Sequence, residues 1–243
     1  MNTTLDFQID GDDFQYIQIA LKPRDAVRAE PGAFVWMEPG IEMETSTGGG
    51  LLSGLKRMIG GESFFVTTFT NQRSVPSTVA FAAPYPGKIL PMDLSRGAIL
   101  CQRDAYLCST LDAQISLAFT RRFGAGLFGG EGFVLQRIEG SGVAFVHASG
   151  SVVEKLLAPG EELRVDTGCI VAMEQGVDYD IQMVRGVKSL LFGGEGLFFA
   201  LLRGPGRVWL QTLPFSRLAG RMMAASGGGR EQGSILGGLG LGE

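Results

Sequence analysis

The chain has 243 residues, of which 45% are hydrophobic, and carries a formal net charge of −4 at pH 7. A single body of this length would bury roughly three quarters of its extended-chain surface, so a large core is expected. Lysine and arginine form no run and no apolar run approaches the roughly 18 residues of a membrane-spanning helix. These features disfavour a clustered basic surface for nucleic acid and a helical membrane span, and they leave open a local patch for single strands.

The beginning of the chain predicts no secretory signal. Residues 1–22 alternate polar and apolar groups, with four aspartates where an apolar signal core would lie. The three cysteines, Cys101, Cys108 and Cys169, form no CxxC pair. We therefore expect buried, reduced thiols and a cytoplasmic location.

Strands dominate the predicted secondary structure. Apolar and polar residues alternate with a period of two, which is typical of half-buried antiparallel strands. Frequent Gly, Pro and Asp between these segments favour hairpins over crossover helices. The clearest segments are residues 14–19, 41–44, 115–119 and 179–183.

Two segments interrupt the β pattern. Residues 48–61 predict one or two helical turns with apolar residues on one side. Near the end of the chain, Leu213 to Met223 predict a short helix capped by Ser216. Residues 226–243 form a glycine-rich tail with too few bulky groups to pack by itself.

Matching runs recur three times along the chain. In each copy a glycine pair is followed by an acid and then by an apolar run, and the acids are Glu62, Glu131 and Glu195. The second glycines of successive pairs lie 69 and 64 residues apart. A second run begins at Gly32, Gly97 and Gly168, and a third at Val79, Val143 and Val208. Arg28 and Arg164 both stand four residues before a glycine of the second run. Regular recurrence of this kind indicates one β unit copied in tandem.

The repeats predict an all-β fold with three tandem β-sandwich-like subdomains in one compact body. We place this body at residues 1–225, with subdomains at about 1–83, 84–150 and 151–215, followed by the tail. Each unit of about seventy residues would share a core with its neighbour.

Two features resemble a known family. An apolar loop precedes the glycine-acid turn at residues 123–130 and 187–194, and the segment 28–37 reads Arg-Ala-Glu-Pro-Gly-Ala-Phe-Val-Trp-Met. Both resemble bacterial members of the altered-inheritance-of-mitochondria, or mitochondrial biogenesis, family, and the likeness runs over nearly the whole chain. It implies a fold similar to the subunits of the tryptophan RNA-binding attenuation protein, of a β-sandwich or double-stranded β-helix type, in three tandem copies, with a trimer as one assembly.

The resemblance brings no catalytic residue and no cofactor, and its mitochondrial members are associated with inner-membrane organisation. A shared fold does not transfer tryptophan or RNA binding. The residues themselves also give little support to an enzyme. No Gly-Lys-Ser or Gly-Lys-Thr follows the glycine turns, and the lone His147 lies on the strand face of Val143 and Phe145, which suits a core or interface residue.

The three turn acids allow two interpretations. If the repeats surround a pseudo-threefold axis, Glu62, Glu131 and Glu195 could converge on a hard cation such as Ca²⁺. The favoured interpretation is structural, with each acid capping its turn or pairing with an arginine. No metal or cofactor is therefore expected.

The apolar loops before the turns predict a contact surface. Flanking lysines and arginines suit an anionic membrane or a protein partner, whereas burial between subunits of a homo-oligomer is the favoured alternative. The residues concerned are Leu51, Leu52, Leu55, Met58, Phe123, Leu127, Phe128, Leu190, Leu191 and Phe192.

The sequence thus predicts a non-enzymatic, oligomeric scaffold or binding protein that contacts a protein partner or a membrane surface through its apolar loops. The alternative is a regulator that binds a small ligand or RNA, by fold similarity to the attenuation protein.

Overall fold

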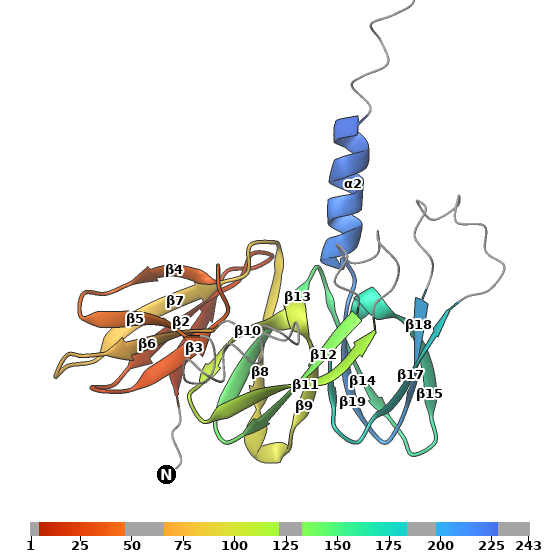
Figure 1. Cartoon of the computed structure of the whole chain (residues 1–243), viewed down its shortest axis with the longest axis horizontal. Coiled ribbons are helices and arrows are strands. Elements are labelled where there is room, and N and C mark those ends of the chain that lie inside the picture. Colours follow the sequence, from red (N-terminus) through yellow and green to blue (C-terminus); the bar gives the residue numbers. More distant parts are fainter. Residues whose placement is uncertain (1–4, 47–65, 122–132, 184–197, 228–243) are drawn as a thin grey trace, which may run out of the picture.

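The computed structural model describes residues 5–46, 66–121, 133–183 and 198–227 (Figure 1). Within these residues, antiparallel strands form four sheets, and one α-helix follows the last strand. Three two-layered units lie side by side along the longest axis, and the chain runs through them in order. The all-β prediction with tandem sandwich-like units is confirmed.

The first unit packs two layers of strands against each other. One layer has the strand order β1-β2-β7-β4 and the other β5-β6-β3. The bounds are β1 Asp6–Asp10, β2 Tyr16–Leu21, β3 Ala26–Ala29, β4 Phe34–Met37, β5 Ile41–Ser46, β6 Val66–Asn71 and β7 Ser77–Ala82.

The second unit has the layers β10-β13-β8 and β11-β12-β9. Its bounds are β8 Gly87–Asp93, β9 Ile99–Gln102, β10 Tyr106–Thr110, β11 Ala113–Arg121, β12 Phe133–Gly140 and β13 Val143–Ser149, with short 3₁₀ turns η1 Leu94–Arg96 and η2 Arg103–Ala105.

The third unit has the layers β16-β19-β14 and β15-β18-β17. Its bounds are β14 Val152–Leu157, β15 Glu162–Asp166, η4 Thr167–Cys169, β16 Ile170–Glu174, β17 Asp178–Met183, β18 Phe198–Arg203 and β19 Gly206–Gln211. The helix α2, Phe215–Gly227, projects away from the sandwiches (Figure 1).

One strand order recurs in all three units. The first unit has β1 as an additional edge strand, so its six equivalent strands are β2 to β7. In each unit, the first of the six strands pairs with the sixth and the sixth with the third, while the second pairs with the fifth and the fifth with the fourth. The units then join by one rule, because the second strand of a unit pairs with the third strand of the next, as β3 with β10 and β9 with β16. Two six-stranded sheets therefore run across the unit boundaries.

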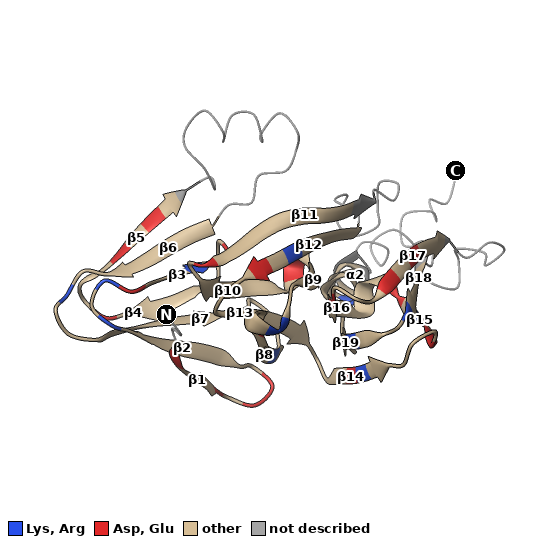
Figure 2. Ribbon diagram, turned by 90° about the horizontal axis from the view of Figure 1, so that it is seen from below, with Lys and Arg blue, Asp and Glu red and all other residues tan. Residues whose placement is uncertain are grey.

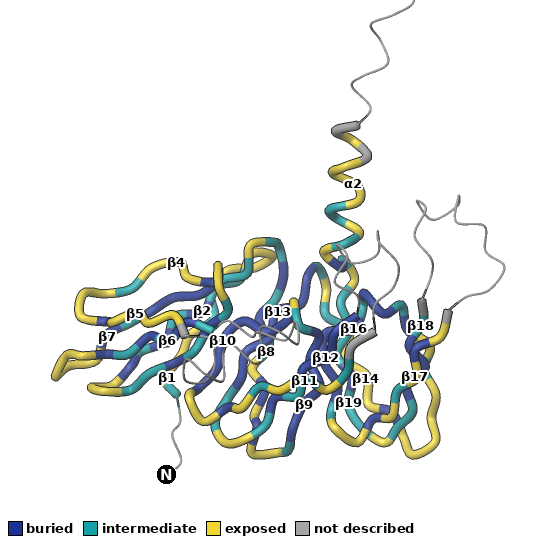
Figure 3. The backbone as a smooth tube through the Cα atoms, viewed as in Figure 1, coloured by how far each residue is buried: buried dark blue, intermediate teal, exposed yellow. Residues whose placement is uncertain are grey.

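The hydrophobic core follows these shared sheets. Phe145 and Leu107 of the second unit belong to the buried cluster of the first unit, together with Phe69 and Phe81. In the same way, Phe133 of the second unit packs in the cluster of the third. Burial is continuous along the body, as the dark blue strands of Figure 3 show. Neighbouring units consequently stabilise each other.

Most predicted elements are confirmed within the described residues. The alternating segments at 14–19, 41–44, 115–119 and 179–183 coincide with β2, β5, β11 and β17. The C-terminal helix is also present, but it begins at Phe215, and the amide of Arg217 donates to the Pro214 carbonyl. Ser216 lies inside the first turn and is not the N-cap. The helical turns predicted at 48–61 lie outside the described residues.

One alignment of the repeats is wrong. Gly97 precedes β9, the second strand of its unit, whereas Gly32 and Gly168 precede the third strands β4 and β16. The residue of the second unit that stands two positions before its third strand is Asp104, in η2. Since this copy makes the turn with a 3₁₀ helix and no glycine, a search for matching glycines selects the wrong strand.

No helix among the residues that the structure describes is long and apolar enough to cross a membrane. The cytoplasmic location stays a prediction.

Phe145 tests the shared core. Its side chain is fully buried and makes an edge-to-face contact with Phe7 at 4.8 Å between ring centroids. We expect Phe145→Ala to lower the free energy of unfolding by about 3–5 kcal/mol, measured by urea denaturation. Phe14, which is 71% exposed, supplies the control, because Phe14→Ala should change stability by less than about 0.5 kcal/mol. Equal effects of the two substitutions would contradict the shared core.

Candidate functional site

Among the strands that the structure describes, two edge strands lack the neighbour that their counterparts have. The joining rule uses the second strand of one unit and the third strand of the next. At the two ends of the body this leaves β4, the third strand of the first unit, and β15, the second strand of the third unit. Both are edges of their sheets. The chain therefore presents the two halves of a third junction.

The β4 edge is unusually apolar. Phe34, Val35 and Trp36 are 41%, 49% and 38% exposed, and β4 is largely yellow in Figure 3. By contrast β10 is buried throughout and β16 is buried in all but its last residue, because a neighbouring unit covers each of them. An exposed, apolar edge strand is a ready template for pairing with another strand.

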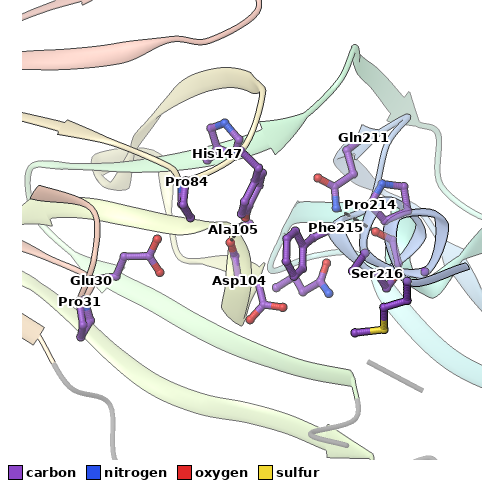
Figure 4. Close-up of a pocket in the computed structure, with 16 residues that line it drawn as sticks. Glu30, Pro31, Pro84, Asp104, Ala105, His147, Gln211, Pro214, Phe215 and Ser216 are labelled. Carbon is purple, nitrogen blue, oxygen red and sulfur yellow. Dashed lines mark hydrogen bonds between the residues drawn. The ribbon is translucent and has the colours of Figure 1, made fainter. Parts of the chain in front are cut away.

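A pocket lies where the turns between second and third strands gather. Its volume is about 570 Å³, which is within the range of small-molecule sites. Glu30 and Pro31 come from the turn of the first unit, Asp104 and Ala105 from that of the second, and Gly168 from that of the third. The pocket thus draws on all three units (Figure 4).

The base of α2 closes another side of the pocket. Phe215, Ala219 and Met223 contribute side chains from this helix. An ion pair at 2.6 Å between Arg217 and Asp166 holds the helix against the end of β15. The pocket wall from α2 is therefore tied to the third unit.

Further hydrogen bonds hold the pocket in shape. Gln211 accepts from the amide of Ser149 and donates to the carbonyl of Gly168, both at 2.9 Å, and so links β13, β19 and η4. The Tyr85 hydroxyl donates to the backbone carbonyl of Asp104 at 2.8 Å. Burial, with Glu30 and Asp104 nearby, raises the pKa of Tyr85, which keeps this hydroxyl a donor.

Aromatic rings line the centre of the pocket. Tyr85 packs edge-to-face on His147 at 4.8 Å and lies at 5.3 Å from Phe215, with the rings tilted by 33°. In Figure 4, Glu30 and Pro31 lie on one side of the view, and Phe215 and Ser216 lie on the other. These rings give this part of the lining a mostly apolar surface.

Glu30 is the most perturbed acid of the pocket. Burial, and secondarily the Asp104 carboxylate, raises the pKa of Glu30 from 4.5 to about 8, and Arg103 offsets part of this shift. Within the described part of the chain, the Glu30 carboxyl group has neither a hydrogen bond nor an ion pair. At pH 7 it is therefore mostly protonated and available to a ligand.

His147 is buried as the sequence predicts, with 2% of its surface exposed. A core histidine is expected to have hydrogen-bond partners for its ring nitrogens. The Nδ1 atom of His147 has none among the described residues. Burial lowers the pKa of His147 from 6.5 to about 4, so the ring is neutral at pH 7.

The residues predicted as sites lie outside the part of the chain that the structure describes. All three turn acids and all ten apolar loop residues lie outside the described residues, so both hypotheses stay predictions. Within the described ranges, no group of three or more His, Cys, Asp or Glu side chains is arranged to hold a metal ion. The three cysteines carry free thiols, two of them buried.

Sequence reasoning missed Glu30, Tyr85 and Asp104 as neighbours. One signal was present, since Glu30, Gln102 and Asp166 are equivalent positions at the end of the second strand of each unit. The strand pairing aligns Ala29 with Cys101, and the preceding arginines align Arg28 with Arg164. Misplacing the second copy at Gly97 concealed this correspondence.

Together, the fold and the pocket define an all-β protein of three tandem sandwiches with a small-molecule-sized cavity at their turns. The profile of the family described as mitochondrial biogenesis AIM24 matches residues 7–213, and the chain belongs to this family. The match covers all three units and ends before α2.

A solved structure is similar over the same body. The X-ray crystal structure of protein SPYM3_0169 from Streptococcus pyogenes matches with a TM-score of 0.74 and 26% sequence identity, covering 91% of this chain and 99% of that one. No curated protein matches the chain.

Glu30 predicts a pH dependence of stability. Because its pKa is raised in the folded state, the folded chain holds a proton that the unfolded chain releases, and stability falls as pH rises from about 4.5 to about 8. Relative to Glu30→Gln, the wild type should lose roughly 2 kcal/mol between pH 5 and 8, after allowance for solvent in the pocket. Urea unfolding across this range measures the difference.

The matched control for this measurement is Glu44→Gln, at an exposed position of β5. It should keep the wild-type pH dependence. Titration of His147 is common to all three proteins and cancels. Parallel curves for wild type and Glu30→Gln would show that Glu30 titrates normally.

Proposed function

We propose that the chain is a non-enzymatic subunit of a homo-oligomeric scaffold, in which β4 of one copy pairs with β15 of the next. One observation carries this proposal: the junction used twice inside the chain leaves its two complementary halves unpaired at the ends. The exposed apolar side chains of β4 support it, because the equivalent strands β10 and β16 are covered by a neighbouring unit.

The internal junctions suggest the register of the contact between copies. Cys108 lies opposite Ala29 at one junction, and Ala172 lies opposite Cys101 at the other. In each unit the third strand pairs with the sixth strand through a bulge. Trp36, Cys108 and Ala172 are the residues that follow this bulge in the three units, so they are equivalent. Val165 is the counterpart of Ala29, since Arg164 and Arg28 precede them. Trp36 of one copy should therefore face Val165 of the next.

A junction of this type is heterologous, since the two paired strands differ. It produces a ring if the rotation from copy to copy closes, and a filament if it does not. We favour a closed ring because it removes every β4 and β15 edge. The trimer implied by the family resemblance is the ring we expect.

Assembly would multiply the apolar loops predicted as a contact surface. These segments connect β5 to β6, β11 to β12 and β17 to β18, which are equivalent strand pairs of the three units. Because the β edges supply the contact between copies in this proposal, the loops remain available to a protein partner or a membrane surface. Many weak contacts then act together through avidity.

The RNA-binding alternative has less support. In the described elements, acidic and basic residues are interspersed, and no continuous basic stretch follows a strand or turn (Figure 2). An RNA-binding surface would require such a stretch to neutralise phosphates.

Trp36 tests the assembly. Light scattering coupled to size exclusion should give the wild type about three times the chain mass of 25.9 kDa. Trp36→Lys should give the mass of one chain, because a lysine on an edge strand opposes pairing. Phe14→Lys places the same charge at an exposed position away from the two edges and should leave the assembly intact. Circular dichroism checks that each variant is folded, and a wild type of single-chain mass would refute the proposal.

A disulfide tests the register. In the double variant Trp36→Cys with Val165→Cys, mild oxidation should link separate chains, because side chains directly opposite each other on adjacent strands are close enough for a disulfide. Non-reducing electrophoresis should show multimers that disappear on reduction. Either single variant should stay monomeric on the gel, and a double variant that does the same would contradict this register.

A further inference from the structure

Beyond assembly, we propose that the pocket at the turns binds an organic ammonium ion that carries an apolar, preferably aromatic, body. Two carboxyl groups, Glu30 and Asp104, line a cavity of about 570 Å³ whose remaining walls are largely apolar. None of the described residues that line it is a lysine or an arginine. The acids of the lining thus favour a cation over an anion, and the apolar walls favour an apolar body attached to it.

The Glu30 carboxyl group supplies the main recognition element. It is turned into the pocket in Figure 4 and has no hydrogen-bonding partner within the described residues. The Glu30 side chain is partly buried, and a ligand that covers it costs free energy unless it supplies a polar partner. An ammonium ion that donates to Glu30 removes this cost and forms a charge-assisted hydrogen bond.

Asp104 reinforces the preference for a cation. Its side chain is more than half exposed and lies 3.5 Å from Arg103, which is its neighbour in η2 and not part of the pocket lining. The charge of Arg103 therefore acts on Asp104 from outside the pocket. A bound ammonium ion would offset the repulsion between Asp104 and the Glu30 carboxylate that forms on binding.

The apolar walls suit an aromatic body. The rings of Tyr85 and Phe215 line the pocket, and Pro31, Pro84 and Met223 add aliphatic surface. Rings attract cations through their faces as well as packing against other rings. His147 is neutral at pH 7 and so does not repel the cation.

Binding should release a proton. Glu30 is mostly protonated at pH 7 when the pocket is empty, and only its carboxylate form pairs with an ammonium ion. Affinity should thus rise between about pH 6 and 8, as the carboxylate form becomes populated. The charged and titratable groups around Glu30 are Asp104 and Arg103 of η2, Tyr85, Cys101 of β9, and Tyr106 and Cys108 of β10. Of these, the buried tyrosines and cysteines have raised pKa values and stay neutral in this range.

The probes are three molecules of similar size: 2-phenylethylamine, 2-phenylethanol and 3-phenylpropionate. Isothermal titration calorimetry with the full chain at pH 7 should show binding of the amine alone. Repeating the titration in buffers of different ionisation enthalpy should reveal proton release. Glu30→Gln should weaken amine binding by roughly tenfold or more, while Glu44→Gln should bind as the wild type does.

A second variant fills the cavity without touching the acids. Ala219→Trp projects from α2 into the pocket lining and should abolish binding of the amine, with circular dichroism as the control for folding. The Trp36→Lys variant should still bind, because the described lining residues already form the pocket within a single chain. This last comparison separates the pocket from the proposed assembly.

Three results would overturn the proposal: no binding of the amine at roughly millimolar concentration, equal binding of the alcohol, or an unchanged affinity in Glu30→Gln. Equal binding of the alcohol would identify a purely apolar pocket. Preference for 3-phenylpropionate would show that the neutral Glu30 acts as a donor to an anion.

Discussion

The backbone pairing between consecutive units is the constraint on which the rest of the structure depends. A single unit of six short strands would be a small sandwich with open edges and little core. When β3 pairs with β10, and β9 with β16, the sheets continue across the boundary and bring side chains of the second unit into the cores of the first and the third. The interior becomes continuous, and one hydrogen-bonding rule defines both the length of the body and the edges at which it stops.

The same pairing explains where a pocket could form. Each junction pairs the second strand of one unit with the third strand of the next. The turns between second and third strands therefore lie next to one another, and each unit contributes one equivalent polar residue there. These have diverged in use. Asp166 pairs with Arg217 and anchors α2, Gln102 lines the pocket wall, and Glu30 remains without a polar partner in the described residues. The three units have the same backbone fold. A substitution at one of these three positions therefore changes the surface of the pocket while the sheets stay intact.

Much of the fold could be predicted from local patterns. Alternation of apolar and polar residues identified β2, β5, β11 and β17, since a strand with one buried face repeats with a period of two. The apolar stretch after residue 213 likewise indicated α2, although its first turn begins before Ser216. Recurring glycines revealed the copies, but failed where Asp104 stands in a 3₁₀ turn instead of a glycine. The pocket had no such pattern, because its walls come from turns about seventy residues apart and from a helix beyond the third unit.

By itself, the sequence determined the fold class, the tandem copying of a β unit and the membership of a mitochondrial biogenesis family that the resemblance indicated. Those properties are written in short stretches of neighbouring residues. Only the tertiary structure decided which strand of one unit meets which strand of the next, and hence that β4 and β15 are left as edges and that Glu30 shares a cavity with Asp104, Tyr85 and α2. Strand partners depend on packing and hydrogen bonding between distant segments, and burial of an acid depends on everything that surrounds it.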